Sequence, residues 1–212
     1  MKDILITDVD GTLLDRMSGY RDVFVDVCNK YGVERKKAGK HYVDTGGTPV
    51  DDQFKGLFTH VEPSFIDQLV KEFFEQADKL PIIFFPETKN ILLKLIEMKV
   101  IVIAISGSNT KELRNIFWIK NNIPLDQIFG TDKVRKGDAS IQTILDFLDI
   151  EAKELSQRAV MTGDTKADME LACRHNILAV GVTNTIDREK LLEAGAVGVI
   201  AEFDQILAFF QK

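Results

Sequence analysis

The sequence has few of the residues that form disulfide frameworks or metal-binding fingers. Its 212 residues include two cysteines and three histidines, and neither type recurs at the short spacings of metal ligands. Cys28 and Cys173 lie far apart in the chain, each within a helical pattern. We therefore expect two reduced thiols that pack against their neighbours, and no disulfide.

Long hydrophobic runs are also missing. No apolar stretch approaches the roughly 20 residues of a membrane span. Charged and polar residues, among them Lys2, Asp3 and Asp8, interrupt the first apolar run, which is unlike a secretory signal. We expect a soluble, cytoplasmic protein without a membrane partner.

Positive charge is in deficit, with 27 Lys and Arg against 33 Asp and Glu, for a formal net charge of −6. This balance argues against non-specific binding of nucleic acid. An anionic substrate would therefore need locally placed cations. With 45% hydrophobic and 28% charged residues, the composition is that of an ordinary globular protein, and it sets no oligomeric state.

What the sequence does contain is a recurring short apolar run of the kind that forms buried parallel strands. Six such runs cover residues 4–6, 100–105, 128–129, 159–161, 177–182 and 197–200. Amphipathic segments long enough for crossover helices lie between them, at residues 87–98, 111–121, 139–148 and 167–174. The alternation predicts an α/β fold, with a three-layer Rossmann-like parallel sheet as its core.

One interval, residues 15–84, breaks the alternation. Its pattern is helical, most clearly at residues 22–31 and 64–79, and it holds no convincing strand. We expect an inserted α-helical cap over residues 15–84, and a core made of residues 1–14 and 85–212. Glycines and a proline mark a loop over residues 45–52 inside the insert.

Chemistry-bearing residues gather where the predicted strands end, which is where open α/β sheets bind their ligands. Asp8 and Asp10 follow the first strand, and Gly11 permits a turn that would face the two carboxylates differently. Ser106 ends the second strand. Gly163 and Asp164 end the fourth, with Asp168 at the start of the next helix.

A phosphate monoester that approaches an aspartate meets like charge, so such a site needs a hard cation and fixed donors. Mg²⁺ suits the task because it prefers oxygen ligands from a few carboxylates, water and phosphate. Lys136 is the candidate side-chain cation, in the loop before a helix that Asp138 could cap. Lys133 and Arg135 lie nearby, and a solvated basic loop would look the same.

The chain resembles the haloacid dehalogenase superfamily of phosphohydrolases, in its phosphoglycolate phosphatase-like branch with a helical cap. The resemblance rests on residues whose order and spacing span the whole chain: Asp8, Asp10, Gly11, Thr12, Ser106, Lys136, Gly163, Asp164 and Asp168. It implies that Asp8 is a nucleophile and Mg²⁺ ligand. The backbone carbonyl of Asp10 and the carboxylate of Asp164 would be further ligands, and Asp168 would orient metal-bound water or Lys136.

The resemblance also implies that Ser106, the Gly107 amide and Lys136 hold the phosphoryl oxygens. Asp10 would be the general acid and base, which protonates the leaving alcohol and later activates water. Carbon–halogen cleavage has no use for such an acid, so Asp10 favours phosphoryl transfer. The expected partner is a small phosphorylated metabolite.

Alternatives remain open for the substrate and the cap. We rank a phosphatase first, a sugar-phosphate mutase second, and a phosphonoacetaldehyde hydrolase, with Lys40 as a Schiff-base lysine, third. A member of another class would bind a phosphorylated ligand without turnover. In the insert, Thr45, Gly46, Gly47 and Thr48 are either a substrate-specificity loop or a plain turn between helices.

Overall fold

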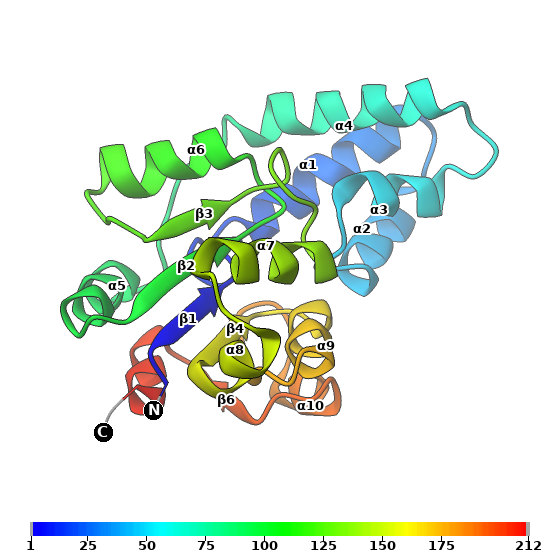
Figure 1. Ribbon diagram of the computed structural model, residues 1–212. Helices are drawn as coiled ribbons and strands as arrows, with labels where there is room; N and C mark the ends of the chain where they lie inside the picture. Colours follow the sequence, from blue (N-terminus) through cyan, green and yellow to red (C-terminus); the bar gives the residue numbers. More distant parts are fainter. Residues whose placement is uncertain (1, 211–212) are drawn as a thin grey trace. The chain divides into compact units, whose positions relative to one another are not determined.

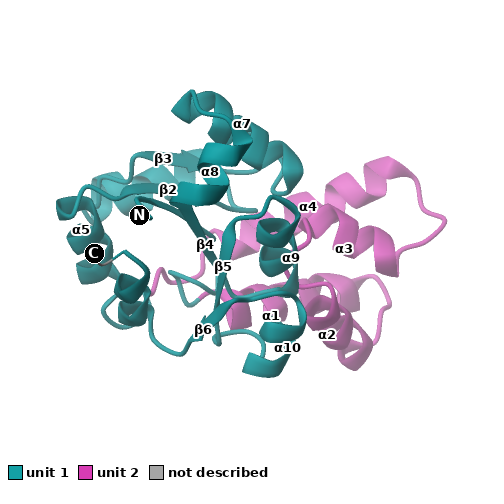
Figure 2. Cartoon of the chain, turned by 60° about the horizontal axis from the view of Figure 1, so that its bottom comes forward, with its two compact units in different colours: residues 1–15, 84–212 teal, residues 16–83 magenta. Residues whose placement is uncertain are grey.

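The structure, a computed structural model, describes residues 2–210. The chain divides into two compact units, shown in different colours in Figure 2. Unit 1 comprises Met1–Asp15 and Phe84–Lys212, and unit 2 comprises Arg16–Ile83. The second unit is therefore an insertion into the first.

Unit 1 is built on a six-stranded sheet in which all strands are parallel (Figure 1). The strands are β1 Ile4–Thr7, β2 Ile101–Ile105, β3 Gln127–Phe129, β4 Ala159–Gly163, β5 Leu178–Val182 and β6 Gly198–Ile200. Each of the six apolar runs forms one of them, which confirms the predicted α/β fold. Every residue of β1 is buried, as expected of a central strand covered on both faces.

The strand order is β3-β2-β1-β4-β5-β6. β1 therefore has β2 on one side, where Ile4 pairs with Ile101, and β4 on the other, where Ile4 pairs with Ala159. The order reverses at this point, and in open α/β sheets ligands bind beyond the carboxyl ends of the strands at such a switch point. The residues that follow β1 and β4 thus occupy the favoured place for a site.

Helices cover the sheet on both faces. A core that includes Ile4, Ile6 and Met161 packs against α7 Asp138–Leu148, α8 Ala152–Arg158, α9 Lys166–Arg174 and α10 Arg188–Glu193. On the other face α5 Thr88–Glu97 packs on β2 and against the 3₁₀-helix η2 Phe203–Phe209. Among the described residues, no helix is both long enough and apolar enough to cross a membrane.

At residues 111–121 the structure has two kinds of helix where the sequence predicts a single α-helix. It begins as α6 Thr110–Arg114 and continues as a π-helix, η1 Asn115–Lys120. Both Ile116 and Phe117 are fully buried, and the Asn121 amide donates to the Ile116 carbonyl. Six residues are too few for the apolar pattern to separate the π-helical period from the α-helical one.

One smaller expectation for unit 1 is wrong. Gly137, not Asp138, is the N-cap of α7, and the Ser140 hydroxyl donates to the Gly137 carbonyl at 2.6 Å. Asp138 is instead the first helical residue, and it pairs with His175. Both cysteines are free thiols: Cys28 is buried in unit 2, and Cys173 is exposed with its Sγ 3.3 Å from the Gly195 carbonyl.

Unit 2 consists of four α-helices: α1 Met17–Lys30, α2 Arg35–Asp44, α3 Val50–Leu57 and α4 Pro63–Ala77. Aromatic rings fill its core, where Phe24 stacks on Phe54 at 4.6 Å between centroids. The predicted loop is shorter than expected, because residues 50–52 form the first turn of α3. Pro49 is the N-cap of that helix, since its fixed φ suits a helix start.

Glycine substitutions test the close packing of unit 1. A Cβ on Gly130, directly after β3, would lie 2.3 Å from the Thr110 nitrogen and 2.4 Å from the Ser108 oxygen. We expect Gly130→Ala to lower the free energy of unfolding by about 1–3 kcal/mol. As a control, Gly39→Ala in α2, where the nearest atom is 3.6 Å away, should raise stability by about 0.5–1 kcal/mol. Urea unfolding measures both, and an unchanged Gly130→Ala protein would contradict the close approach.

Candidate active site

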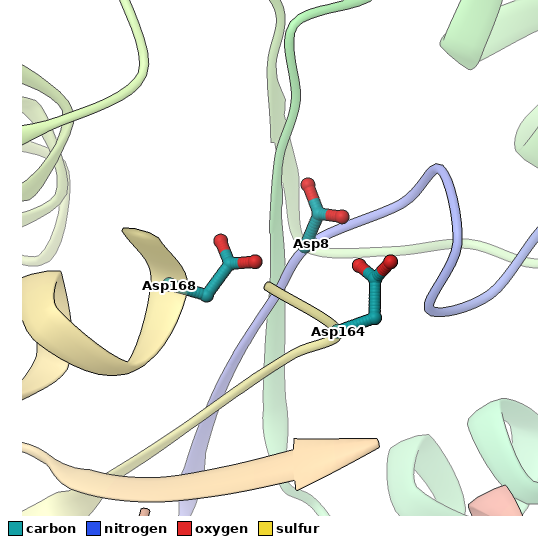
Figure 3. A group of neighbouring side chains, drawn as sticks. All are labelled: Asp8, Asp164 and Asp168. Carbon is teal, nitrogen blue, oxygen red and sulfur yellow. The ribbon is translucent and has the colours of Figure 1, made fainter. Parts of the chain in front are cut away.

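The acidic residues predicted from the sequence meet at the switch point of the sheet. Asp8 follows β1 directly and Asp164 follows β4, and the two strands are neighbours. Asp168 reaches the same place from the first turn of α9. Figure 3 shows the three carboxylates turned toward a common space, and one oxygen of each lies within 4.8 Å of the others.

A tight turn after Asp8 separates the directions of the first two acids. The Val9 carbonyl accepts the N–H groups of residues 12, 13 and 14, at 3.3, 2.8 and 2.9 Å. Gly11 closes the turn at a φ of +90°, a conformation that glycine adopts without steric cost. Asp8 is thereby buried beside Asp164, whereas Asp10 lies in a less buried position, next to the loop after β2.

Lys136 supplies the counter-charge in this cluster. Its Nζ lies 2.5 Å from Asp8 Oδ1 and 2.7 Å from Asp168 Oδ1. The side chain is 11% exposed, whereas Lys133 and Arg135 in the same loop are exposed residues. The structure thus brings Lys136 into contact with the acids, whereas Lys133 and Arg135 are exposed.

Burial and neighbouring charges together raise the pKa values of Asp8, Asp164 and Lys136. Burial raises the pKa of Asp8 well above its usual range, against the opposing charge of Lys136. Burial, with the charge of Asp168, also raises the pKa of Asp164 to about 6. For Lys136 burial would lower the pKa, but the carboxylates of Asp168 and Asp8 outweigh it and raise the pKa above its ordinary value.

Asp168 is fixed by a capping box at the start of α9. Its Oδ2 accepts the Thr165 hydroxyl at 2.5 Å and the Thr165 N–H at 3.2 Å, which satisfies backbone donors at the helix N-terminus. The preceding strand passes so close that a Cβ on Gly163 would lie 2.4 Å from Asp168 Cγ. The glycine before Asp164 therefore makes room for Asp168.

Asp164 is held by two hydroxyl groups. The Thr12 hydroxyl donates to Oδ1 at 3.0 Å, and the Thr185 hydroxyl donates to Oδ2. Thr12 lies inside the acidic segment that carries the resemblance, but the resemblance implied no role for it. Thr185 was missed altogether, although it lies in the loop after β5, at the same carboxyl edge of the sheet as the other residues.

Asp10 is bonded to two serines in the loop after β2. The Ser106 hydroxyl donates to Asp10 Oδ2 at 3.1 Å, and the Ser108 hydroxyl donates to the same oxygen at 2.7 Å. Sequence reasoning singled out Ser106 and missed Ser108. Gly107 between them is exposed, and a Cβ there would meet no atom within 4 Å.

The chemistry of the donor set fits a hard divalent cation. The three acids offer only oxygen ligands, and with one lysine they carry a formal charge of −3 + 1 = −2 when ionised. Buried charge of one sign is costly unless a counter-charge balances it. An ion such as Mg²⁺, which prefers carboxylate oxygens and water, would supply that balance.

Other residues singled out in the sequence lie in unit 2. Thr45, Gly46, Gly47 and Thr48 connect α2 to α3, and the Thr48 hydroxyl donates to the Thr45 carbonyl at 2.7 Å. Lys40 is exposed on α2 and forms an ion pair with Asp44. The part of these residues in substrate recognition stays a prediction.

Solved structures with the same fold are numerous. A hydrolase from Pseudomonas syringae aligns with a TM-score of 0.84 at 19% identity, over 99% of this chain and 98% of the other. A predicted phosphatase from Clostridium acetobutylicum aligns with a TM-score of 0.83 at 19% identity, over 99% and 98%. A predicted phosphoglycolate phosphatase from Haemophilus somnus aligns with a TM-score of 0.77 at 13% identity, over the same shares. At such identities the likeness shows the fold.

Sequence comparison gives the family. No curated protein sequence matches the chain. The model of the haloacid dehalogenase-like hydrolase family matches residues 5–182, a range that contains the acidic cluster, Lys136 and both serines. The chain therefore belongs to the haloacid dehalogenase-like hydrolases.

Proposed function

We propose that this protein is a magnesium-dependent phosphatase that hydrolyses a small phosphorylated metabolite through an aspartyl-phosphate. The main support for this proposal is that Asp8 lies at the switch point in contact with Lys136, while Asp10, two residues on, accepts hydrogen bonds from serine hydroxyls. This separation supports Asp8 as the attacking carboxylate and Asp10 as the proton-transfer group. A nucleophile and a separate acid and base are what hydrolysis through an aspartyl-phosphate uses.

In the first step, an Asp8 oxygen forms a bond to phosphorus as the bond to the leaving oxygen breaks. Asp10 gives its proton to that oxygen, and the alcohol leaves. Lys136 stays protonated beside Asp8 and offsets the charge of the incoming phosphate. The Ser106 hydroxyl and the Gly107 amide, in the loop that faces Asp10, donate to phosphoryl oxygens.

In the second step, Asp10 takes a proton from water as the water oxygen attacks phosphorus. The bond to Asp8 breaks, which releases inorganic phosphate and restores the carboxylate. Mg²⁺, held by Asp8, Asp164 and the Asp10 backbone carbonyl, would neutralise charge on the phosphoryl group when bound. Asp168 holds Lys136 in place.

We further propose that unit 2 is a cap that governs access, with residues 45–48 as its specificity loop. Such an insert can exclude water from the reaction.

The same fold is compatible with a mutase, which would pass the phosphoryl group to a second hydroxyl. A Schiff base on Lys40 is disfavoured, because this lysine is exposed and paired with Asp44. We also propose that the protein acts in the cytoplasm, without a nucleic-acid or membrane partner.

The metal requirement is tested on a panel of phosphorylated metabolites. Turnover should vanish in excess chelator and return with Mg²⁺. Ca²⁺ should not restore it, because its larger and looser coordination would misplace the phosphoryl group. Full activity in excess chelator would exclude the proposed metal role, and transfer of phosphate to a second hydroxyl rather than to water would identify a mutase.

Cation binding should depend on pH in the range where Asp164 titrates. Because the pKa of Asp164 in the metal-free protein is raised to about 6, protons compete with the cation below that pH. The Mg²⁺ affinity, measured by calorimetry, should therefore fall about tenfold for each pH unit below 6. Asp138→Asn removes an exposed carboxylate outside the cluster and should leave the dependence unchanged. An affinity that is flat from pH 7.5 to 5 would contradict the assignment.

Two isosteric variants separate the roles of Asp8 and Asp10. Asp8→Asn should form no phosphoenzyme and show essentially no turnover. Asp10→Asn keeps the nucleophile, so an ester with a good leaving group should still phosphorylate Asp8. Hydrolysis of that phosphate should slow by about 10²–10⁴-fold, and phosphoenzyme should accumulate.

Rapid-quench labelling followed by mass mapping reads out both variants. The label should map to Asp8 in the wild type and in Asp10→Asn. A phosphate on Asp10 or on Ser106, or on no residue in either protein, would overturn the proposed mechanism.

A further inference from the structure

Ser108 lies beside the proposed proton-transfer group, yet the reaction as derived gives it no part. Its side chain is 2% exposed, and its hydroxyl donates to Asp10 Oδ2 at 2.7 Å. The Ser106 hydroxyl donates to the same oxygen at 3.1 Å. One carboxylate oxygen of Asp10 thus receives two hydroxyl donors from a single loop.

The two serines differ in what happens when a phosphoryl group binds. A serine hydroxyl has one proton to donate. Ser106 now gives that proton to Asp10, while its oxygen accepts the Ser108 N–H at 3.0 Å. To donate to a phosphoryl oxygen, Ser106 must release Asp10. Ser108 can still donate to the Asp10 carboxylate at that stage and help to keep it in place.

The backbone around Ser108 is anchored from the neighbouring loop. The Ser108 carbonyl accepts the Thr131 N–H at 3.0 Å. Gly130 passes so close that a Cβ on it would lie 2.4 Å from the same oxygen. The backbone of Ser108 is therefore hydrogen-bonded and closely packed. Its hydroxyl thus has a fixed position, as a group that orients a reacting side chain must have.

We propose that Ser108 is a positioning residue, which holds the Asp10 carboxylate toward the leaving group and then toward water once Ser106 has turned to the phosphoryl group. The inference rests on the proposed phosphatase function and adds a residue to it. Ser108 touches neither phosphate nor cation in this scheme. Its effect on the reaction passes through Asp10.

The test uses Ser108→Ala in the full-length protein with Mg²⁺ and p-nitrophenyl phosphate. The variant removes the hydroxyl but keeps the backbone N–H that bonds Ser106, so phosphate binding and kcat/KM, which report the first step, should change little. Release of nitrophenol needs little acid assistance, whereas hydrolysis of phospho-Asp8 needs Asp10 as a base. A misplaced base should slow that second step by about 10- to 100-fold. The variant should therefore show a burst of about one nitrophenol per site, followed by slow turnover.

Two variants provide the contrast. Ser106→Ala should raise KM, because a phosphoryl donor is lost. Ser156→Ala removes a half-buried hydroxyl on α8 that bonds the Lys153 carbonyl, outside the acidic cluster, and should behave as wild type. Ser108→Cys, close to serine in shape but a weak donor, is the second form of the test if Ser108→Ala is unstable, and it should show the same burst.

The outcomes separate this inference from the function on which it rests. Absence of turnover by the wild type, on every phosphate ester, would overturn the proposed function and this inference with it. Wild-type turnover combined with a Ser108→Ala or Ser108→Cys protein that shows no burst, or only a raised KM, would overturn the inference alone. A burst with a lowered kcat and an unchanged kcat/KM supports it.

Discussion

The rest of the site depends on one ion-pair arrangement, in which the Lys136 ammonium lies between Asp8 and Asp168. Three carboxylates buried so close together repel one another, and each loses its hydration. The lysine offsets part of that cost, and the remaining negative charge suits a divalent cation. Removal of the lysine alone would leave buried acids without their counter-charge, so its place before α7 is as constrained as that of the acids.

The acids are fixed by lysine, threonine and serine side chains from loops at the carboxyl edge of the sheet. The lysine contacts Asp8 and Asp168, threonine hydroxyls hold Asp164, and serine hydroxyls hold Asp10. Asp8 thus lies against a charged group, whereas serine hydroxyls contact Asp10, so two acids in one short segment have different surroundings.

Much of this arrangement could be predicted from sequence, because it follows from the spacing of apolar residues and from where a residue stands relative to the end of a strand. Buried parallel strands appear as short apolar runs, and residues after them lie at one edge, so Asp8, Ser106 and Asp164 could be found. Thr185 and Ser108 could not, because a lone hydroxyl in a loop has no pattern of its own. The π-helix after Arg114 and the early start of α3 at Val50 depend on packing that local periodicity does not record.

The junction of the insert has a consequence for how such a protein can diverge. Leu14 and Phe84 pair in an antiparallel bridge, and the Phe85 N–H bonds the Leu13 carbonyl at 3.1 Å. Unit 1 itself thus holds the two chain ends of the insert side by side. In evolution, a segment of another length or shape could replace residues 16–83 at this seam without displacing Asp8 or Asp10. Under the proposed role of unit 2 as a cap, selection on what the enzyme recognises is thereby uncoupled from selection on its chemistry.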